Sequence, residues 1–352
     1  MSVIVAPLLL ALVLGVLLTP LGIRAAWATS FLDHPEARKL HTSATALLGG
    51  VVVFVCAVLA AELVRLVALP AWRPPLGVAA GALLVLLLGV WDDRFGMRPL
   101  LKLSGQVAAA ALLLGSQRIP DLGVAAPLSF VLAVFVLVAL MNAMNFLDNM
   151  NGMVGGLSAI LFAAFAWASA ARGDVGLACA QLAGAGACVG FLCYNFPRAR
   201  IFLGDAGSLL LGYSLGASAL LAFEGAPQGW GRVGPLLMLA YPAFDMCFVV
   251  INRLREGRKI YEGGKDHSNH RLASVLKCQK RTVTLLWLVG AALAASGLVV
   301  LNLNRALPAV LLSALWIILF LWAGLRLSSV PVARPTPALQ HPLPAVSPSP
   351  KI

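Results

Sequence analysis

The chain has 352 residues, of which 60% are hydrophobic and only 11% are charged, and its formal net charge is +12 at pH 7. This composition excludes a water-soluble globule, because too few polar side chains are present to cover its surface. The positive charge indicates topology control and argues against nucleic-acid binding, because the basic residues are gathered into short segments between apolar runs.

Apolar runs of roughly 20 residues, the length that crosses a bilayer core as a helix, recur along the chain. Divided at charge clusters and turn signals, the sequence predicts eleven spans, at 3–23, 47–69, 75–91, 100–116, 127–147, 153–171, 174–194, 207–223, 233–251, 283–302 and 307–325. The first run has no basic residue before it and Arg24 after it, which favours a retained span over a cleaved signal peptide. The fold class expected is an all-α integral membrane protein, with residues 1–327 forming one polytopic domain.

The basic residues predict how the spans are oriented. If the segments after odd-numbered spans are cytoplasmic, twenty of the 26 Lys and Arg residues lie on that side and six on the other. The positive-inside rule then places the amino terminus outside and the carboxyl terminus in the cytoplasm, with the protein in a cell inner membrane. Residues 328–352 are rich in Pro, Ser and Ala, cannot bury a core, and are expected to form a disordered cytoplasmic tail.

Four aspartates fall at the cytoplasmic ends of these spans. Asp92 and Asp93 close the third span, Asp148 closes the fifth and Asp205 opens the eighth. An aspartate at a helix start is an ordinary cap, but Asp92, Asp93 and Asp148 lie at helix ends, where the macrodipole disfavours an anion. A hard cation such as Mg²⁺, with Mn²⁺ able to replace it, would balance their charge.

Basic and imidazole side chains gather on the same predicted face. They are Lys39 and His41 in the first loop, Lys102 after the third span, and His267, His270 and Arg271 before the tenth span. Carboxylates that hold Mg²⁺ beside cations that bind phosphoryl oxygens form the charge layout of phosphoryl transfer. A secondary transporter is the alternative from another class, but its ionisable residues would lie near the membrane midplane, and the sequence shows no internal repeat.

Five stretches within about residues 30 to 275 carry these side chains. They are 33–41 with Gly49 and Gly50, Asp92 and Asp93 followed by Lys102, 142–148, 195–197 with 201–208, and 266–271. In type and order they resemble the motifs of the polyprenyl-phosphate N-acetylhexosamine-1-phosphate transferases, the family that includes the first enzymes of common-antigen, teichoic-acid and O-antigen lipid pathways.

The resemblance implies that undecaprenyl phosphate attacks the β-phosphorus of a UDP-N-acetylhexosamine, with N-acetylglucosamine the sugar expected, and that UMP is released. The alternatives are an enzyme like the phospho-MurNAc-pentapeptide translocase and a member that binds both substrates without turnover, against which the intact aspartates argue. The partners implied are the two substrates and the lipid bilayer, and a homodimer is left open.

The resemblance also implies roles for individual residues. Asp205 would bind Mg²⁺ together with Asp148, and Asp92 with Asp93 would orient or deprotonate the lipid phosphate, a covalent route being the alternative. The catalytic residues implied are Asp92, Asp93, Asp205 and His267. The residues implied to contact substrate are Lys39, His41, Lys102, Asn145, Asp148, Asn151, Asn195, Phe202, His270 and Arg271.

Phe202 and Asn195 are assigned by the resemblance to the base, Phe202 by stacking on uracil and Asn195 by a polar contact. Phe202 precedes Asp205 by three residues, a spacing that at a helix start would put both side chains on one face.

The sequence departs from the family's pattern in the loops. Asn149 and Asn151 stand where the common bacterial pattern has Gly and Asp, and Asn269 replaces a His. These departures concern the choice of sugar more than the class of reaction.

Overall fold

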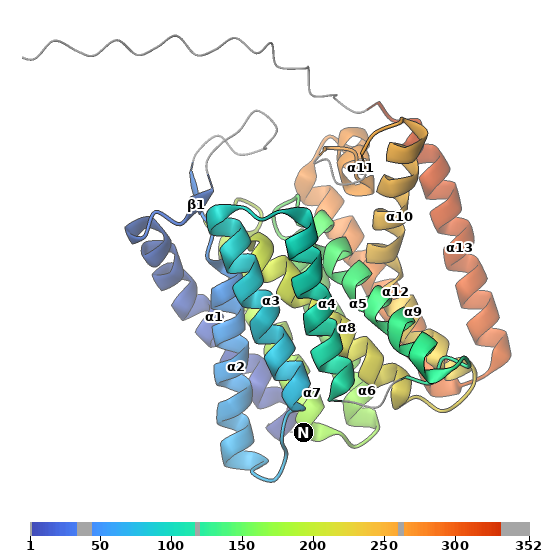
Figure 1. Cartoon of the computed structure of the whole chain (residues 1–352), viewed down its shortest axis with the longest axis horizontal. Helices are drawn as coiled ribbons and strands as arrows, with labels where there is room; N and C mark the ends of the chain where they lie inside the picture. The colour runs from blue at the N-terminus through green and yellow to red at the C-terminus, as the bar shows by residue number, and fades with distance from the viewer. Residues whose placement is uncertain (1, 34–43, 117–119, 260–263, 332–352) are drawn as a thin grey trace, which may run out of the picture.

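The computed structural model describes residues 2–33, 44–116, 120–259 and 264–331, and over these residues the chain is a bundle of helices (Figure 1). Apolar runs become helices because a helix satisfies every backbone polar group within its own segment. The helices are α1 (Ser2–Ala28), α2 (Gly49–Ala68), α3 (Leu76–Phe95), α4 (Pro99–Gly115), α5 (Ala126–Leu147), α6 (Met153–Ala171), α7 (Val175–Asn195), α8 (Gly204–Glu224), α9 (Val233–Met238), α10 (Ala240–Arg255), α11 (Ser268–Leu276), α12 (Gln279–Leu303) and α13 (Ala306–Ser328), with a 3-10 turn η1 (Trp230–Arg232).

The expected fold class is confirmed. Within the described ranges nine helices are long and apolar enough to cross a membrane, namely α1, α2, α3, α5, α6, α7, α8, α12 and α13. α4 is apolar but has only 17 residues. The count of eleven spans therefore stays a prediction.

The predicted ninth span, 233–251, is not one straight helix. The segment 230–238 and α10 meet at 64° and would make one broken span together. Pro242 lies in the first turn of α10 and has no N–H to donate to the carbonyl four residues earlier, which accounts for the break at Leu239.

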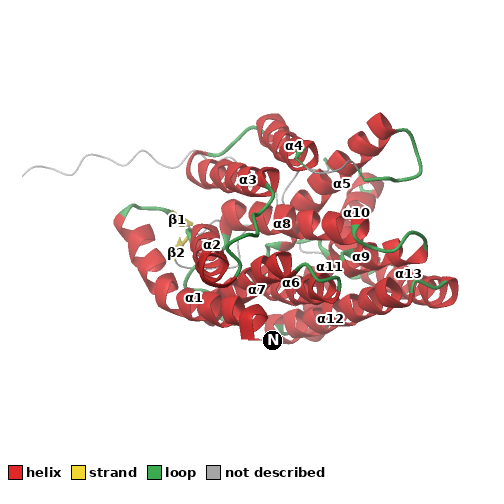
Figure 2. Cartoon of the chain, turned by 90° about the horizontal axis from the view of Figure 1, so that it is seen from below, coloured by secondary structure: helices red, strands yellow, loops and turns green. Residues whose placement is uncertain are grey.

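The helices differ in how deeply they are buried in the bundle, and α13 lies at its edge (Figure 2). In α8, 78% of an 18-residue apolar stretch is buried inside the bundle, whereas in α13 the corresponding share is 6%. Small residues allow the central helices to approach closely: a Cβ at Gly190 of α7 would lie 2.5 Å from the Leu12 carbonyl oxygen of α1.

A short antiparallel pair, β1 (Leu32–Asp33) with β2 (Thr45–Ala46), lies at the end of the bundle where α3 ends and α10 and α11 meet (Figure 1). Ala46 forms a parallel bridge with Ile201, and the Leu203 carbonyl accepts from the N–H of Gly50 at 2.9 Å. The start of α2 therefore fixes the segment that leads into α8.

Candidate active site

Asp93 caps α8 from the end of α3. Its Oδ1 accepts from the N–H of Asp205 at 2.8 Å and its Oδ2 from the N–H of Ala206 at 3.0 Å. Gly89 permits this approach, because a Cβ there would lie 2.3 Å from the Ala206 Cα. The carboxylate, unfavourable at the end of its own helix, thus accepts hydrogen bonds at the positive end of another, and a cation that balances its charge stays a prediction.

Lys102 lies between two carboxylates from different helices. Its Nζ is 2.8 Å from Asp92 Oδ2 and also donates to Asp205 Oδ2. Asn145 of α5 donates to the other oxygen of Asp205 at 2.7 Å and contacts Ser208 Oγ at 2.9 Å. The structure therefore brings together four predicted site residues from α3, α4, α5 and α8.

A buried amide pair lies one helical turn further along α4 and α5. Asn142 Nδ2 donates to Gln106 Oε1 at 2.7 Å, and Gln106 is almost fully buried. Because Gln106 follows Lys102 by one turn and Asn142 precedes Asn145 by one turn, the pair fixes the register in which those two side chains reach Asp205. Sequence reasoning missed Gln106, although an uncharged polar side chain inside an apolar helix was the available signal.

Asp148 terminates α5 beside these residues. Its partial burial, with the negative charges of Asp205 and Asp93, raises its pKa to about 8. Within the described ranges no group of three His, Cys, Asp or Glu side chains could hold a metal ion. The hard oxygen donors and the uncompensated negative charge nevertheless fit Mg²⁺, which proteins commonly bind through one or two carboxylates plus substrate phosphates.

Both the oxygen and the nitrogen of the Asn195 side-chain amide are hydrogen-bonded to the backbone. Its Oδ1 accepts from the N–H of Gly152 at 2.7 Å and its Nδ2 donates to the Ile201 carbonyl at 2.9 Å. Asn151 Nδ2 donates to the Pro197 carbonyl at 3.2 Å. Both residues hold the loop at 151–152 against the end of α7, and their contacts with substrate stay predictions.

Phe202 does not lie on a helix. α8 begins at Gly204, and Phe202 is held in the preceding segment, where its N–H donates to the Ala46 carbonyl at 2.8 Å and its own carbonyl accepts from Gly49 at 3.0 Å. The prediction that Phe202 and Asp205 share a helical face was wrong, because pairing with β2 and α2 keeps Phe202 out of the first turn. Stacking on uracil stays a prediction.

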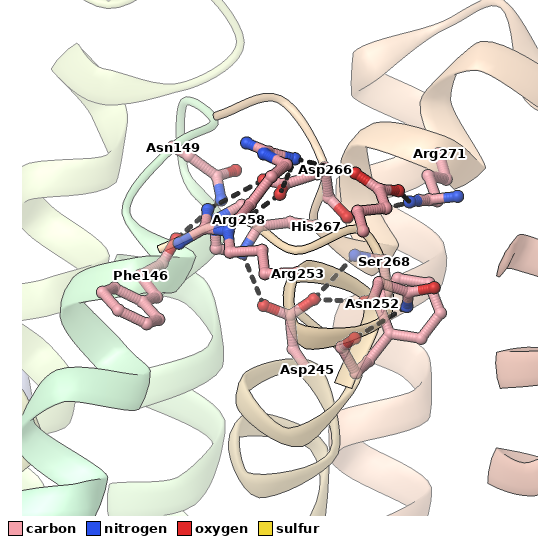
Figure 3. A network of polar contacts seen from close by, with 12 residues as sticks. Phe146, Asn149, Asp245, Asn252, Arg253, Arg258, Asp266, His267, Ser268 and Arg271 are labelled. Carbon is pink, nitrogen blue, oxygen red and sulfur yellow. Dashed lines mark hydrogen bonds and ion pairs between the residues drawn. The ribbon is translucent and has the colours of Figure 1, made fainter. Parts of the chain in front are cut away.

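A buried polar network surrounds His267 (Figure 3). His267 Nδ1 lies 2.8 Å from Asp245 Oδ2, and Asp245 Oδ1 accepts from the N–H and the hydroxyl of Ser268 at 2.8 and 2.5 Å. The imidazole meets the Phe146 ring edge to face, with centroids 5.9 Å apart. Asp245 had no assigned role from the sequence, although a carboxylate inside an apolar segment is a signal for one.

Asp266 lies beside His267 and pairs with two arginines. Arg253 binds it through two hydrogen bonds of 2.8 Å, and Arg258 adds a third at 2.9 Å. Burial alone would raise the pKa of Asp266, but the hydrogen bonds and charge of Arg253, with His267 and Arg258, lower it to about 2. The loop between α10 and α11 is therefore held in place by its own ion pairs.

Arg271 follows in the same motif and is buried. It donates to the carbonyls of Leu327, Ser328 and Val330 at the end of α13. These donors are engaged by backbone, and a contact of Arg271 with phosphate stays a prediction.

Two departures from the family pattern contact each other. Asn269 Nδ2 donates to Asn149 Oδ1 at 2.7 Å, which joins the loop after α5 to α11. His270 lines a cavity of about 290 Å³ beside them. The burial of its imidazole, and then the charge of His267, lowers the pKa of His270 to about 4.

Lys39 and His41, the remaining predicted residues, lie outside the described residues.

The fold and the site define a multi-pass membrane protein with carboxylates and cations converging at one end of a helical bundle. The model of glycosyl transferase family 4 matches residues 75–223. The chain is 32% identical over 292 residues to the decaprenyl-phosphate N-acetylglucosaminephosphotransferase of Mycolicibacterium smegmatis, covering 72% of this chain and 71% of that one. It is 29% identical to the probable undecaprenyl-phosphate N-acetylglucosaminyl 1-phosphate transferase of Bacillus subtilis, over 82% of each chain. The chain belongs to glycosyl transferase family 4.

Proposed function

We propose that this protein transfers N-acetylglucosamine 1-phosphate from UDP-N-acetylglucosamine to undecaprenyl phosphate and releases UMP, as the first membrane step of a cell-envelope polysaccharide pathway. The observation that carries the proposal is the convergence of Asp92, Lys102, Asn145 and Asp205 at one end of the bundle. The names of the relatives support the sugar and the polyprenyl phosphate acceptor. The site would face the cytoplasm of an inner membrane, where nucleotide sugars are available.

The reaction needs two anions to approach each other. A lipid phosphate is already an anion near neutral pH, so it requires positioning and charge screening more than a base. Lys102 would bind phosphoryl oxygens, and Asp92, bonded to Lys102, would orient the ammonium. Asp205 and Asp148 would hold Mg²⁺, which when bound screens the charge of the diphosphate. These roles favour direct attack over a covalent intermediate.

The test of the proposal uses the purified protein with Mg²⁺, undecaprenyl phosphate and a panel of UDP-sugars. We expect UMP release and a lipid-linked product with UDP-N-acetylglucosamine, and loss of both after chelation with EDTA. No UMP release with any UDP-sugar would reject the proposal, and a secondary transporter would then be tested by uptake into vesicles.

Asp205→Asn is expected to lower kcat by ~10²–10³-fold or more, because a neutral amide removes the charge that holds the cation against the diphosphate. The matched control is Asp174→Asn. Asp174 caps α7 through its bond from Leu177, and Asn is an equally good cap, so this variant should retain activity. Activity of Asp205→Asn within threefold of wild type would exclude Asp205 as a metal ligand.

A further inference from the structure

We propose that Asp245 is a positioning residue of the transfer reaction, which fixes the tautomer of His267 and directs its Nε2 to the diphosphate of the donor. The inference rests on the proposed function. Figure 3 shows the residues concerned, on α10, on α11 and at the end of α5.

Asp245 uses its two oxygens for separate purposes. Oδ1 accepts from the N–H and the hydroxyl of Ser268, which stabilises the first residue of α11. Oδ2 lies 2.8 Å from His267 Nδ1. One oxygen therefore caps a helix, and the other is directed at the ring.

The hydrogen-bond pattern fixes where the proton of His267 lies. The Ser268 N–H can only donate, and its hydroxyl proton goes to the same oxygen, so Tyr241 donates to the Ser268 hydroxyl across 3.3 Å. With the carboxylate acting as acceptor, Nδ1 carries the proton and the lone pair of the neutral ring lies on Nε2.

The ring lies beside the catalytic end of α5. Phe146, its edge-to-face partner, directly follows Asn145 and precedes Asp148 by two residues. Since the in-plane directions of the two ring nitrogens diverge, Nε2 points away from the Asp245 carboxylate that Nδ1 faces. Among the residues that the structure describes, none hydrogen-bonds to Nε2, so this nitrogen is available to a ligand.

A buried carboxylate on Nδ1 changes what Nε2 can do. When Nε2 takes up a proton, the charge of Asp245 compensates the imidazolium, so the ring can donate Nε2–H to an anionic phosphate oxygen. A purely structural role does not need Oδ2, because Asp266 with Arg253 and Arg258 already fastens the loop.

The substitution Asp245→Asn gives a specific chemical expectation. The amide oxygen must face Ser268, whose N–H cannot accept, so the amide NH₂ faces His267 Nδ1. The ring is then forced into the opposite tautomer, with its proton on Nε2. We expect kcat to fall by ~10²-fold or more, while KM for the UDP-sugar changes by less than about threefold.

The kinetic test is a double-mutant cycle. Asp245→Asn, His267→Gln and the double variant are compared for kcat, KM and thermal stability. If Asp245 acts through His267, the double variant is no slower than His267→Gln alone. Ser268→Ala is the control: it removes one bond to Oδ1, leaves Oδ2 on the ring and should keep kcat within threefold. Additive losses in kcat, or a kcat of Asp245→Asn within threefold of wild type, would overturn the proposal.

A second measurement does not depend on turnover. ¹⁵N NMR of histidine-labelled protein reports which ring nitrogen carries the proton, and the His267→Gln spectrum assigns the signal among the five histidines. We expect the proton on Nδ1 in wild type and on Nε2 in Asp245→Asn. A wild-type proton on Nε2 with bare Nδ1 would overturn the inference, whereas the expected tautomers in a protein that transfers no sugar phosphate would reject the proposed function instead.

Discussion

Lys102 shows how one side chain compensates two carboxylates. Its side chain is 16% exposed, and those of Asp92 and Asp205 are 12% and 33% exposed. We expect Lys102→Met to lower the free energy of unfolding by about 3 kcal/mol in the absence of Mg²⁺, because it leaves the two anions facing each other. Thermal unfolding in detergent measures this.

Asp92→Asn in the Lys102→Met background should recover part of the lost stability, because it removes one of the two repelling charges. A Lys102→Met variant as stable as wild type would contradict the expectation and would show that water screens the two carboxylates.

The residues at this site differ in how far the sequence could predict them. Counting crossings between apolar runs predicted that Asp92 and Asp205 lie on the same face of the membrane. It could not predict that Asp93 bonds to Ala206 or that Asp245 bonds to His267. Those contacts depend on how the helices pack side by side, which the number of crossings does not determine.

The connection between α10 and α11 depends on the ionised form of Asp266. Its pKa is lowered from an ordinary value of 3.8 to about 2. The stabilisation is therefore fully present above about pH 4 and is lost as the pH falls through 2, and it amounts to roughly 2 kcal/mol. We expect the difference in thermal midpoint between wild type and Asp266→Asn to be constant from pH 7 to pH 5 and to shrink below pH 4.

A difference in midpoint that stays unchanged down to pH 3 would mean that the carboxylate contributes nothing through its charge. Glu256→Gln is the control, because Glu256 contacts Arg258 at 3.3 Å from an exposed position and should give no such profile.

The length of the apolar runs was enough to predict that helices form there. It was not enough to predict where a helix is interrupted or where it begins. The segment 233–251 was expected to be one helix, and Phe202 was expected to share a helical face with Asp205. Pro242 breaks the first, and backbone bonds with Ala46 and Gly49 hold Phe202 outside α8. In the first place a local residue, and in the second a distant strand, overrides the tendency of the segment to form a continuous helix.

At the scale of the whole molecule, the candidate site and most of the basic residues in the described ranges lie at one end of the bundle. The two ends of α3 offer a matched test of orientation, because exposed Arg73 precedes the helix and exposed Arg98 follows it. In a background without the exposed Cys193 and Cys247, we expect Arg73→Cys to react with an impermeant thiol reagent in intact cells. Arg98→Cys should react only after permeabilisation.

Labelling of Arg98→Cys in intact cells would show that the protein has the opposite orientation in the membrane. It would also reject a cytoplasmic site, because Lys102 lies in the first turn of the helix that begins after Arg98.

The bonds from Arg271 to the carbonyls of Leu327, Ser328 and Val330 set an order of assembly. A nascent chain that has inserted α12 already contains Asp92, Asp205 and His267, but it lacks these acceptors. Helices enter a membrane from the amino terminus onward during synthesis, so the segment around His267 reaches its final arrangement only after residues 327–330 have left the ribosome. A helix that lies at the lipid-facing edge of the bundle thus determines when during translation the protein becomes competent.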